Sequence, residues 1–224
     1  MEVKMKSSIG LYLKCLCFCL FACIGLSQHA NAQVKNIELH WNSLNAPCDG
    51  NCFVSAFAGP FVVSGASELF AGKTTFVTAD YDASDILVGG AIGRKAATLF
   101  EHFHIEFELG IAQRFGRQEE TEFFYAHSLK FDGFPWRKYL YTSISLKGGL
   151  SYATDISDIE RARSPLEGTN RLLHILAPEL TLALPKYPGY EALFRFHHRS
   201  GFYGLVSDTE GGAQYMTFGL RKNF

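Results

Sequence analysis

This sequence of 224 residues has no excess of basic residues, no long helical pattern and no apolar run long enough to span a bilayer as a helix. Its formal net charge is −1, so it does not supply the positively charged face that nucleic-acid binding requires. Its apolar run at 15–26 is shorter than the roughly 20 residues that a membrane-spanning helix needs. We therefore expect no nucleic-acid partner and no helical bundle.

The N-terminus has the pattern of a cleaved signal peptide. Two lysines precede the apolar run, and Ala30-Asn31-Ala32 has small residues at both positions of an A-x-A cleavage site. We expect residues 1–32 to be removed by a cut before Gln33, which leaves an exported chain. A membrane anchor, or a lipoprotein-type site that ends at Cys23, would be the alternatives.

Cysteine is scarce once this segment is set aside, because four of the six cysteines lie within residues 1–32. Cys48 and Cys52 flank a turn-forming Asp-Gly-Asn, and an exported protein meets an oxidising compartment, so we expect a local disulfide. No cluster of histidines or carboxylates stands nearby to complete a metal site. We expect residues 33–52 to lead into the folded domain, 53–224, and we assign no cofactor and no metal.

What the exported chain does have is alternation of apolar and polar residues with a period of two, typical of strands with two different faces. In "HFHIEFELGIAQRF" (102–115) the phenylalanines, isoleucines and leucine share one face, and the histidines and glutamates share the other. The stretches 140–150, 170–184 and 213–224 alternate in the same way. The alternation continues beyond the ~5–6 residues of an ordinary strand.

Two architectures produce such strands, a soluble sandwich and a transmembrane barrel. The long strands, the aromatic residues near strand ends and the terminal Phe224 favour the barrel, because Phe224 shares a face with Phe218 and Leu220 and so resembles the sorting signal of bacterial outer-membrane barrels. The sequence therefore predicts an all-β, antiparallel transmembrane β-barrel. Eight strands are expected if residues 64–84 form mostly a loop, and more if "TTFVTADY" (74–81) forms a separate strand.

The lengths of the connections predict how the barrel is oriented. If the last strand descends to the periplasm, then "PKYPG" (185–189) and "FDGFPW" (131–136) become periplasmic turns. The long charged segment 153–170 and "GRQEE" (116–120) then become outer loops. The sequence predicts a protein embedded in the bacterial outer membrane.

The stretch "RFHHRSGFYG" (195–204) carries the candidate chemistry. Side chains alternate along the expected strand, so His198 and Ser200 share the lipid-facing side with the phenylalanines. Three cationic residues, Arg195, His197 and Arg199, point inward, where Glu106, Glu108 or Glu179 are expected to pair with them.

A histidine two positions from a serine can act as the base and the nucleophile of an esterase. Ser200 would attack an acyl ester and His198 would take its proton. Glu210 is the first candidate for the acidic residue that orients the imidazole, and Asp208 is the second. The alternative is that His198 and Ser200 are ordinary polar groups at the height of the lipid headgroups.

The C-terminal third resembles the lipid A 3-O-deacylase family of small outer-membrane barrels. That resemblance rests on His198-x-Ser200 followed by Glu210, and it implies an outer-wall site that acts on lipopolysaccharide or a related outer-leaflet lipid. The motifs "FELGIAQRFG", "FPW", "GLSYAT", "FRFHHRSGFYG" and "GGAQYMTFGLR" are in addition similar to a group of uncharacterised proteobacterial outer-membrane barrels.

Three functions therefore compete. The first is a serine-type acyl-ester hydrolase that uses His198 and Ser200. The second is a non-enzymatic structural or surface-interaction barrel that acts through the 153–170 loop. The third, a diffusion pore, is disfavoured because side chains fill the interior of an eight-stranded barrel.

Overall fold

The computed structural model describes residues 39–42, 45–164, 169–209 and 211–224. The expected signal peptide and Glu210 lie outside the described residues. No helix in the described part of the chain is long and apolar enough to cross a membrane.

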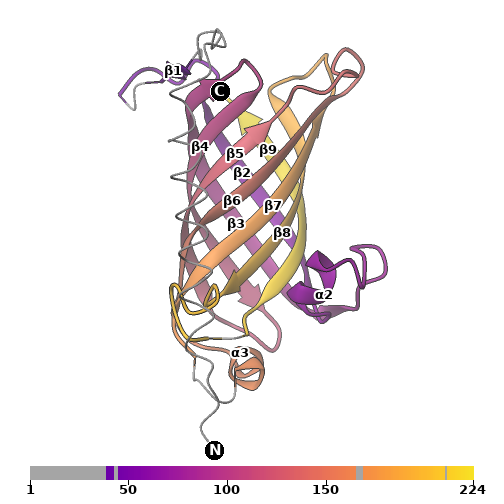
Figure 1. Cartoon of the computed structure of the whole chain (residues 1–224), viewed down its shortest axis with the longest axis vertical. Coiled ribbons are helices and arrows are strands. Elements are labelled where there is room, and N and C mark those ends of the chain that lie inside the picture. Colours follow the sequence, from indigo (N-terminus) through magenta and orange to yellow (C-terminus); the bar gives the residue numbers. More distant parts are fainter. Residues whose placement is uncertain (1–38, 43–44, 165–168, 210) are drawn as a thin grey trace, which may run out of the picture. The chain divides into compact units, whose positions relative to one another are not determined.

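Eight antiparallel strands close into a barrel (Figure 1). They are β2 (Cys52–Val62), β3 (Tyr81–Leu99), β4 (Phe103–Phe115), β5 (Thr121–Phe131), β6 (Tyr141–Ala153), β7 (Leu172–Ala183), β8 (Tyr190–Ser200) and β9 (Gln214–Asn223). Neighbours in sequence pair with one another, and β9 pairs with β2 to close the ring. A short strand, β1 (Leu39–Trp41), pairs with the far end of β3. The predicted fold and the predicted count of eight are confirmed.

The two faces of each strand follow the predicted alternation. On β4 the side chain of Glu108 is 3% exposed whereas its neighbour Leu109 is 59% exposed. On β6 Lys147 is 1% exposed and Leu146 is 57% exposed. Charged groups inside and apolar groups outside are the reverse of a soluble protein, and this arrangement defines a transmembrane barrel with a lipid-facing belt.

The two ends of the barrel differ, as predicted. At the turn end, the connections 100–102, 132–140 and 184–189 are short, and the C-terminal Phe224 pairs with Cys52 through two backbone hydrogen bonds. The predicted Cys48–Cys52 disulfide is confirmed and stands at this end.

At the opposite, loop end, the connections are longer except at 116–120. Segment 63–80 contains helix α2 (Ala66–Phe70), segment 154–171 contains helix α3 (Asp158–Arg163), and segment 201–213 follows β8. Both helices lie at this end in Figure 1. Segment 63–80 is mostly loop, which is why the strand count stays at eight.

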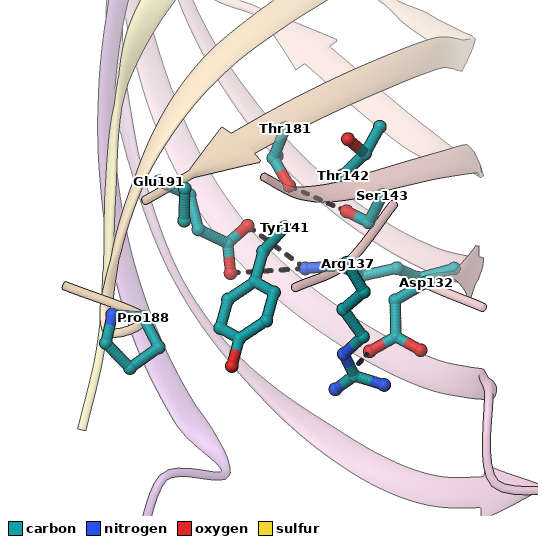
Figure 2. Close-up of a pocket in the computed structure, with 10 residues that line it drawn as sticks. Asp132, Arg137, Tyr141, Thr142, Ser143, Thr181, Pro188 and Glu191 are labelled. Carbon is teal, nitrogen blue, oxygen red and sulfur yellow. Dashed lines mark hydrogen bonds and ion pairs between the residues drawn. The ribbon is translucent and has the colours of Figure 1, made fainter. Parts of the chain in front are cut away.

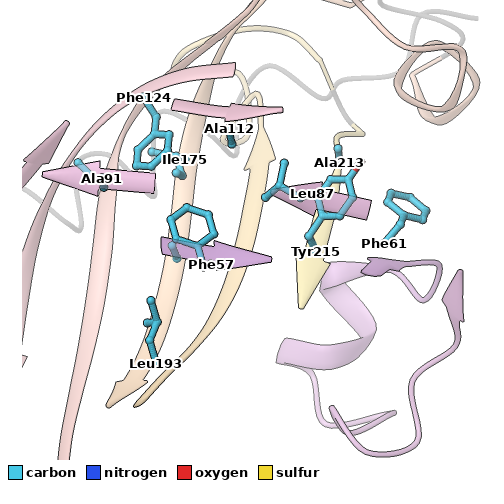
Figure 3. Close-up of a cluster of buried hydrophobic side chains, with 12 residues drawn as sticks. Phe57, Phe61, Leu87, Ala91, Ala112, Phe124, Ile175, Leu193, Ala213 and Tyr215 are labelled. Carbon is cyan, nitrogen blue, oxygen red and sulfur yellow. The ribbon is translucent and has the colours of Figure 1, made fainter. Parts of the chain in front are cut away.

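The interior of the barrel combines an apolar cluster with ion pairs. Phe57, Leu87, Phe124 and Tyr215 belong to the cluster (Figure 3). Arg195 pairs with Glu108 at 3.1 Å and with Glu179 at 2.6 Å, which confirms two of the predicted partners.

The other inward basic residues pair differently from the expectation. His197 pairs with Glu122 at 2.9 Å, and Arg199 pairs with Glu160 at 3.4 Å. The third predicted partner, Glu106, pairs instead with Arg221, at 2.6 Å. Glu122 and Glu160 were not predicted because the register of distant strands and the placement of α3 decide these pairs.

Helix α3 closes the loop end of the lumen. Its N-cap serine, Ser157, accepts a hydrogen bond from the backbone N–H of Glu160. The carboxylate of Glu160 is buried and lies 3.2 Å from a guanidinium nitrogen of Arg114. Ile159 packs against the apolar cluster. The described residues thus form a packed interior, which is unfavourable for a diffusion pore.

The lipid-facing belt leads to a prediction. Leu146→Arg, near the middle of β6, is expected to lower the free energy of unfolding by about 2–4 kcal/mol, because a charge at the bilayer midplane is costly. Leu172→Arg, at the first residue of β7, is the matched control and should cost about 0–1 kcal/mol near the interface. Urea titrations in lipid vesicles measure both values. Equal losses for the two variants would contradict this placement of the membrane.

Candidate outer-wall site

The end of β8 presents the candidate residues as the alternation predicts. Arg195, His197 and Arg199 are fully buried inside the barrel, whereas His198 and Ser200 have the outward parity and are partly covered. Gly201 ends the strand. A side chain at Gly201 would collide with the backbone carbonyls of Ser207 and Thr209. The glycine therefore permits the tight turn of the following loop.

Two histidines flank Ser200 on the outer wall. His198 lies two residues earlier on β8, and His174 lies directly across from Ser200 on β7. The ring of His174 stacks on Phe202, with centroids 4.3 Å apart. The Nδ1 atoms of both histidines are buried and have no hydrogen-bond partner among the described residues. Sequence reasoning did not single out His174, although its parity on 170–184 would have placed it on the outer face.

The wall at Phe196, two residues before His198 on β8, is not open to lipid, because segment 63–80 packs against it. Phe196, expected to face lipid, is only 2% exposed. It clusters with Val62 and Met216, and the rings of Phe70 and Phe76 lie 5.8 Å and 5.5 Å from its own. The parity prediction for Phe196 is therefore right, but the prediction of lipid contact is wrong, because a loop distant in sequence covers this face.

His198 has two identifiable neighbours on this wall. Its ring stacks with that of Phe196, with centroids 6.0 Å apart and 7° between the planes. Gln214 on β9 is its cross-strand partner, so the side chain of Gln214 lies beside the imidazole on the same wall.

The sequence candidates for the acidic residue are not brought to His198 by any described contact. Asp208 is exposed, close to Gly204 in the loop after β8. Glu210, the first candidate, lies outside the described residues. Within the described ranges no hydrogen bond or ion pair joins His198 to a carboxylate, and none joins Ser200 to His198.

A second polar feature is a cavity of about 170 Å³ at the turn end (Figure 2). Ion pairs cross it, with Lys130 3.1 Å from Glu191 and Arg137 3.5 Å from Asp132. Burial raises the pKa of Asp132, but the hydrogen bond and charge of His104, followed by the charge of Arg137, outweigh burial and lower it. Since its charges are mutually paired, this cavity has the character of a structural network.

No group of three or more histidines, cysteines or carboxylates could hold a metal ion in the part of the chain that the structure covers. Nucleophilic catalysis by serine requires a base that takes the hydroxyl proton, and Ser200 has an imidazole on either side as a candidate for this base.

The fold defines the class of this protein, which is a small eight-stranded transmembrane β-barrel. No protein-family model matches the chain, and no curated protein matches it.

Solved structures that are similar to it include the following three. A de novo designed transmembrane β-barrel has 10% identity and a TM-score of 0.44, over 78% of this chain and 96% of that one. Neisserial surface protein A (NspA) has 12% identity and a TM-score of 0.45, over 77% and 97%. LpxR from Salmonella typhimurium has 10% identity and a TM-score of 0.31, over 70% and 60%. Likeness at this level carries no argument about function.

Proposed function

We propose that this protein is an outer-membrane acyl-ester hydrolase that acts on lipid A or a related outer-leaflet lipid. Ser200 is the nucleophile and His198 is the general base. The observation that carries the proposal is the outward-facing serine between two histidines whose Nδ1 atoms are buried without partners. An unpaired buried polar atom costs about 1–3 kcal/mol, so each one calls for an explanation, and a role in proton transfer is one.

The reaction follows from these groups. The Oγ atom of Ser200 attacks the ester carbonyl while His198 accepts the hydroxyl proton, and the imidazolium then gives this proton to the departing alkoxide. Water hydrolyses the acyl-serine with His198 again as base, which releases the fatty acid and restores Ser200. Glu210 remains the first candidate from the sequence for the acid that orients His198, and Asp208 remains the second.

The surroundings of the site suit a lipid substrate. Segments 63–80 and 201–213 at the loop end flank the site. Both carry large exposed apolar side chains, namely Phe70, Phe76 and Val77 on the first and Tyr203 and Leu205 on the second. Exposed apolar and aromatic groups beside a lipid-facing belt favour contact with the membrane interface. With the loop end on the cell surface, as its long loops favour, the site faces the outer leaflet.

The proposal is tested by expressing the wild-type chain in a Gram-negative host and analysing the lipids by mass spectrometry. The expected result is lipid A, or another outer-leaflet lipid, that has lost one ester-linked fatty acyl chain, with the free fatty acid recovered. A host that carries the empty vector is the control. Unchanged lipid A and phospholipid spectra would exclude this activity and leave the surface-interaction function, through the 153–170 loop, as the alternative.

A further inference from the structure

Gln214 lies beside His198 in a strongly constrained position. It is the first residue of β9, it pairs with His198 in the β8–β9 register, and its side chain is almost fully buried. Its Nε2 atom donates to the backbone carbonyl of Val62, at 3.3 Å, and to that of Ser64. β9 lies between β2 and β8, so the end of β2 and the start of segment 63–80 hold the amide of Gln214 from the side opposite to His198.

These two contacts determine which way the amide points. Backbone carbonyls only accept hydrogen bonds, so they must face the NH₂ group of Gln214. The Oε1 atom, which only accepts, is then the atom left to face the imidazole of His198, the cross-strand partner of Gln214. An acceptor on one ring nitrogen keeps a proton there and leaves the other nitrogen as a base.

We propose that Gln214 is the residue that orients His198, in place of an acidic third member. This inference rests on the proposed function and deepens it. A neutral amide in this role has a precedent in the Cys-His-Asn arrangement of papain-like proteases. Within the described residues, no hydrogen bond or ion pair brings a carboxylate to His198. An amide therefore suffices to select the tautomer, although it carries no charge to stabilise the imidazolium.

The test compares Gln214→Met with Glu210→Gln. Met has a similar length but accepts no comparable hydrogen bond, so kcat for ester hydrolysis is expected to fall about 10- to 100-fold with KM nearly unchanged, because a misplaced base costs this much. Glu210→Gln is expected to change kcat less than threefold. The reverse ranking, with the wild type active, would show that Glu210 orients the base and would overturn the inference while leaving the proposed function intact.

Gln214 also holds segment 63–80, so its structural role needs a separate control. Leu69→Ala loosens the same segment, since Leu69 packs against the Phe196 cluster, but it leaves Gln214 in place. It is expected to lower stability with little change in kcat. An equal fall in kcat for Leu69→Ala and Gln214→Met would mean that Gln214 acts only through the segment, and the inference would be wrong.

A measurement that does not depend on activity completes the test. In protein labelled with ¹⁵N-histidine, the nitrogen shifts of His198 are expected to report one neutral tautomer in the wild type and a mixture of both in Gln214→Met. If the wild-type protein already shows the mixture, or if the substitution changes nothing, Gln214 does not orient the ring. The nitrogen shifts test the orientation of His198 by Gln214 even if the wild type hydrolyses no lipid. Absence of hydrolysis would refute the proposed function but not this orientation.

Discussion

Replacing Ser200 by alanine is expected to abolish the release of fatty acid while the barrel stays folded. Without the Oγ atom no acyl-serine forms, and loss of a serine nucleophile lowers kcat by about 10³-fold or more. Stability should barely change, because Ser200 lies at the end of β8 and no described hydrogen bond depends on its hydroxyl. Lipid mass spectra measure the activity, and the heat-dependent shift in gel mobility measures the folding.

Two further variants sharpen this result. His198→Ala should lose as much activity as Ser200→Ala, and the double variant should lose little more, because members of a catalytic unit are not additive. Ser67→Ala, which changes an exposed serine of α2, is the control and should retain full activity. Active Ser200→Ala protein would place the nucleophile elsewhere. A fluorophosphonate probe that labels the wild type but not Ser200→Ala would support the assignment directly.

The largest expected loss of stability comes from Arg195→Met in the barrel interior. The Nε atom of Arg195 donates to Glu179 at 2.7 Å, and its Nη2 atom donates to Glu108 at 3.1 Å. The Nζ atom of Lys147 lies 3.0 Å from the same carboxylate of Glu108. The guanidinium of Arg195 also lies over the ring of Phe57. Removing it leaves two buried carboxylates with one cation, and breaking a buried ion pair from one side costs about 3–5 kcal/mol.

Urea unfolding in vesicles measures this loss, and two neighbouring variants interpret it. Arg195→Lys keeps the charge but cannot form the forked contacts, so an intermediate loss is expected. Phe194→Leu changes the adjacent, lipid-facing position and should cost less than about 1.5 kcal/mol. If Arg195→Met were no less stable than Phe194→Leu, the ionic interior would contribute nothing to folding.

Much of the fold could be predicted from the sequence because alternation is a local signal. The face of each residue on 102–115 follows from a period of two, and a closed barrel needs no other long-range information to separate lipid from lumen. The same rule assigned His197 and Arg199 to the interior and His198 and Ser200 to the outer wall. These assignments agree with the structure, whereas the catalytic roles of His198 and Ser200 remain predictions.

The rest of the site could not be read in this way. His174 had the right parity but only the β7–β8 register places it opposite Ser200. Gln214 likewise has outward parity, yet its role depends on the carbonyl of Val62, 152 residues away. The acidic candidates Glu210 and Asp208 were chosen by proximity in sequence, which says little about where a loop side chain points.

The amino-acid sequence by itself determined the transmembrane barrel, its eight strands, its two unlike ends and the wall on which the candidate residues stand, because each follows from local alternation and the length of connections. Only the tertiary structure decided that α3 closes the lumen through Glu160, that segment 63–80 covers Phe196, and that Gln214 lies against His198. These contacts join loops to distant strands, and their geometry depends on register and packing, which no local pattern encodes.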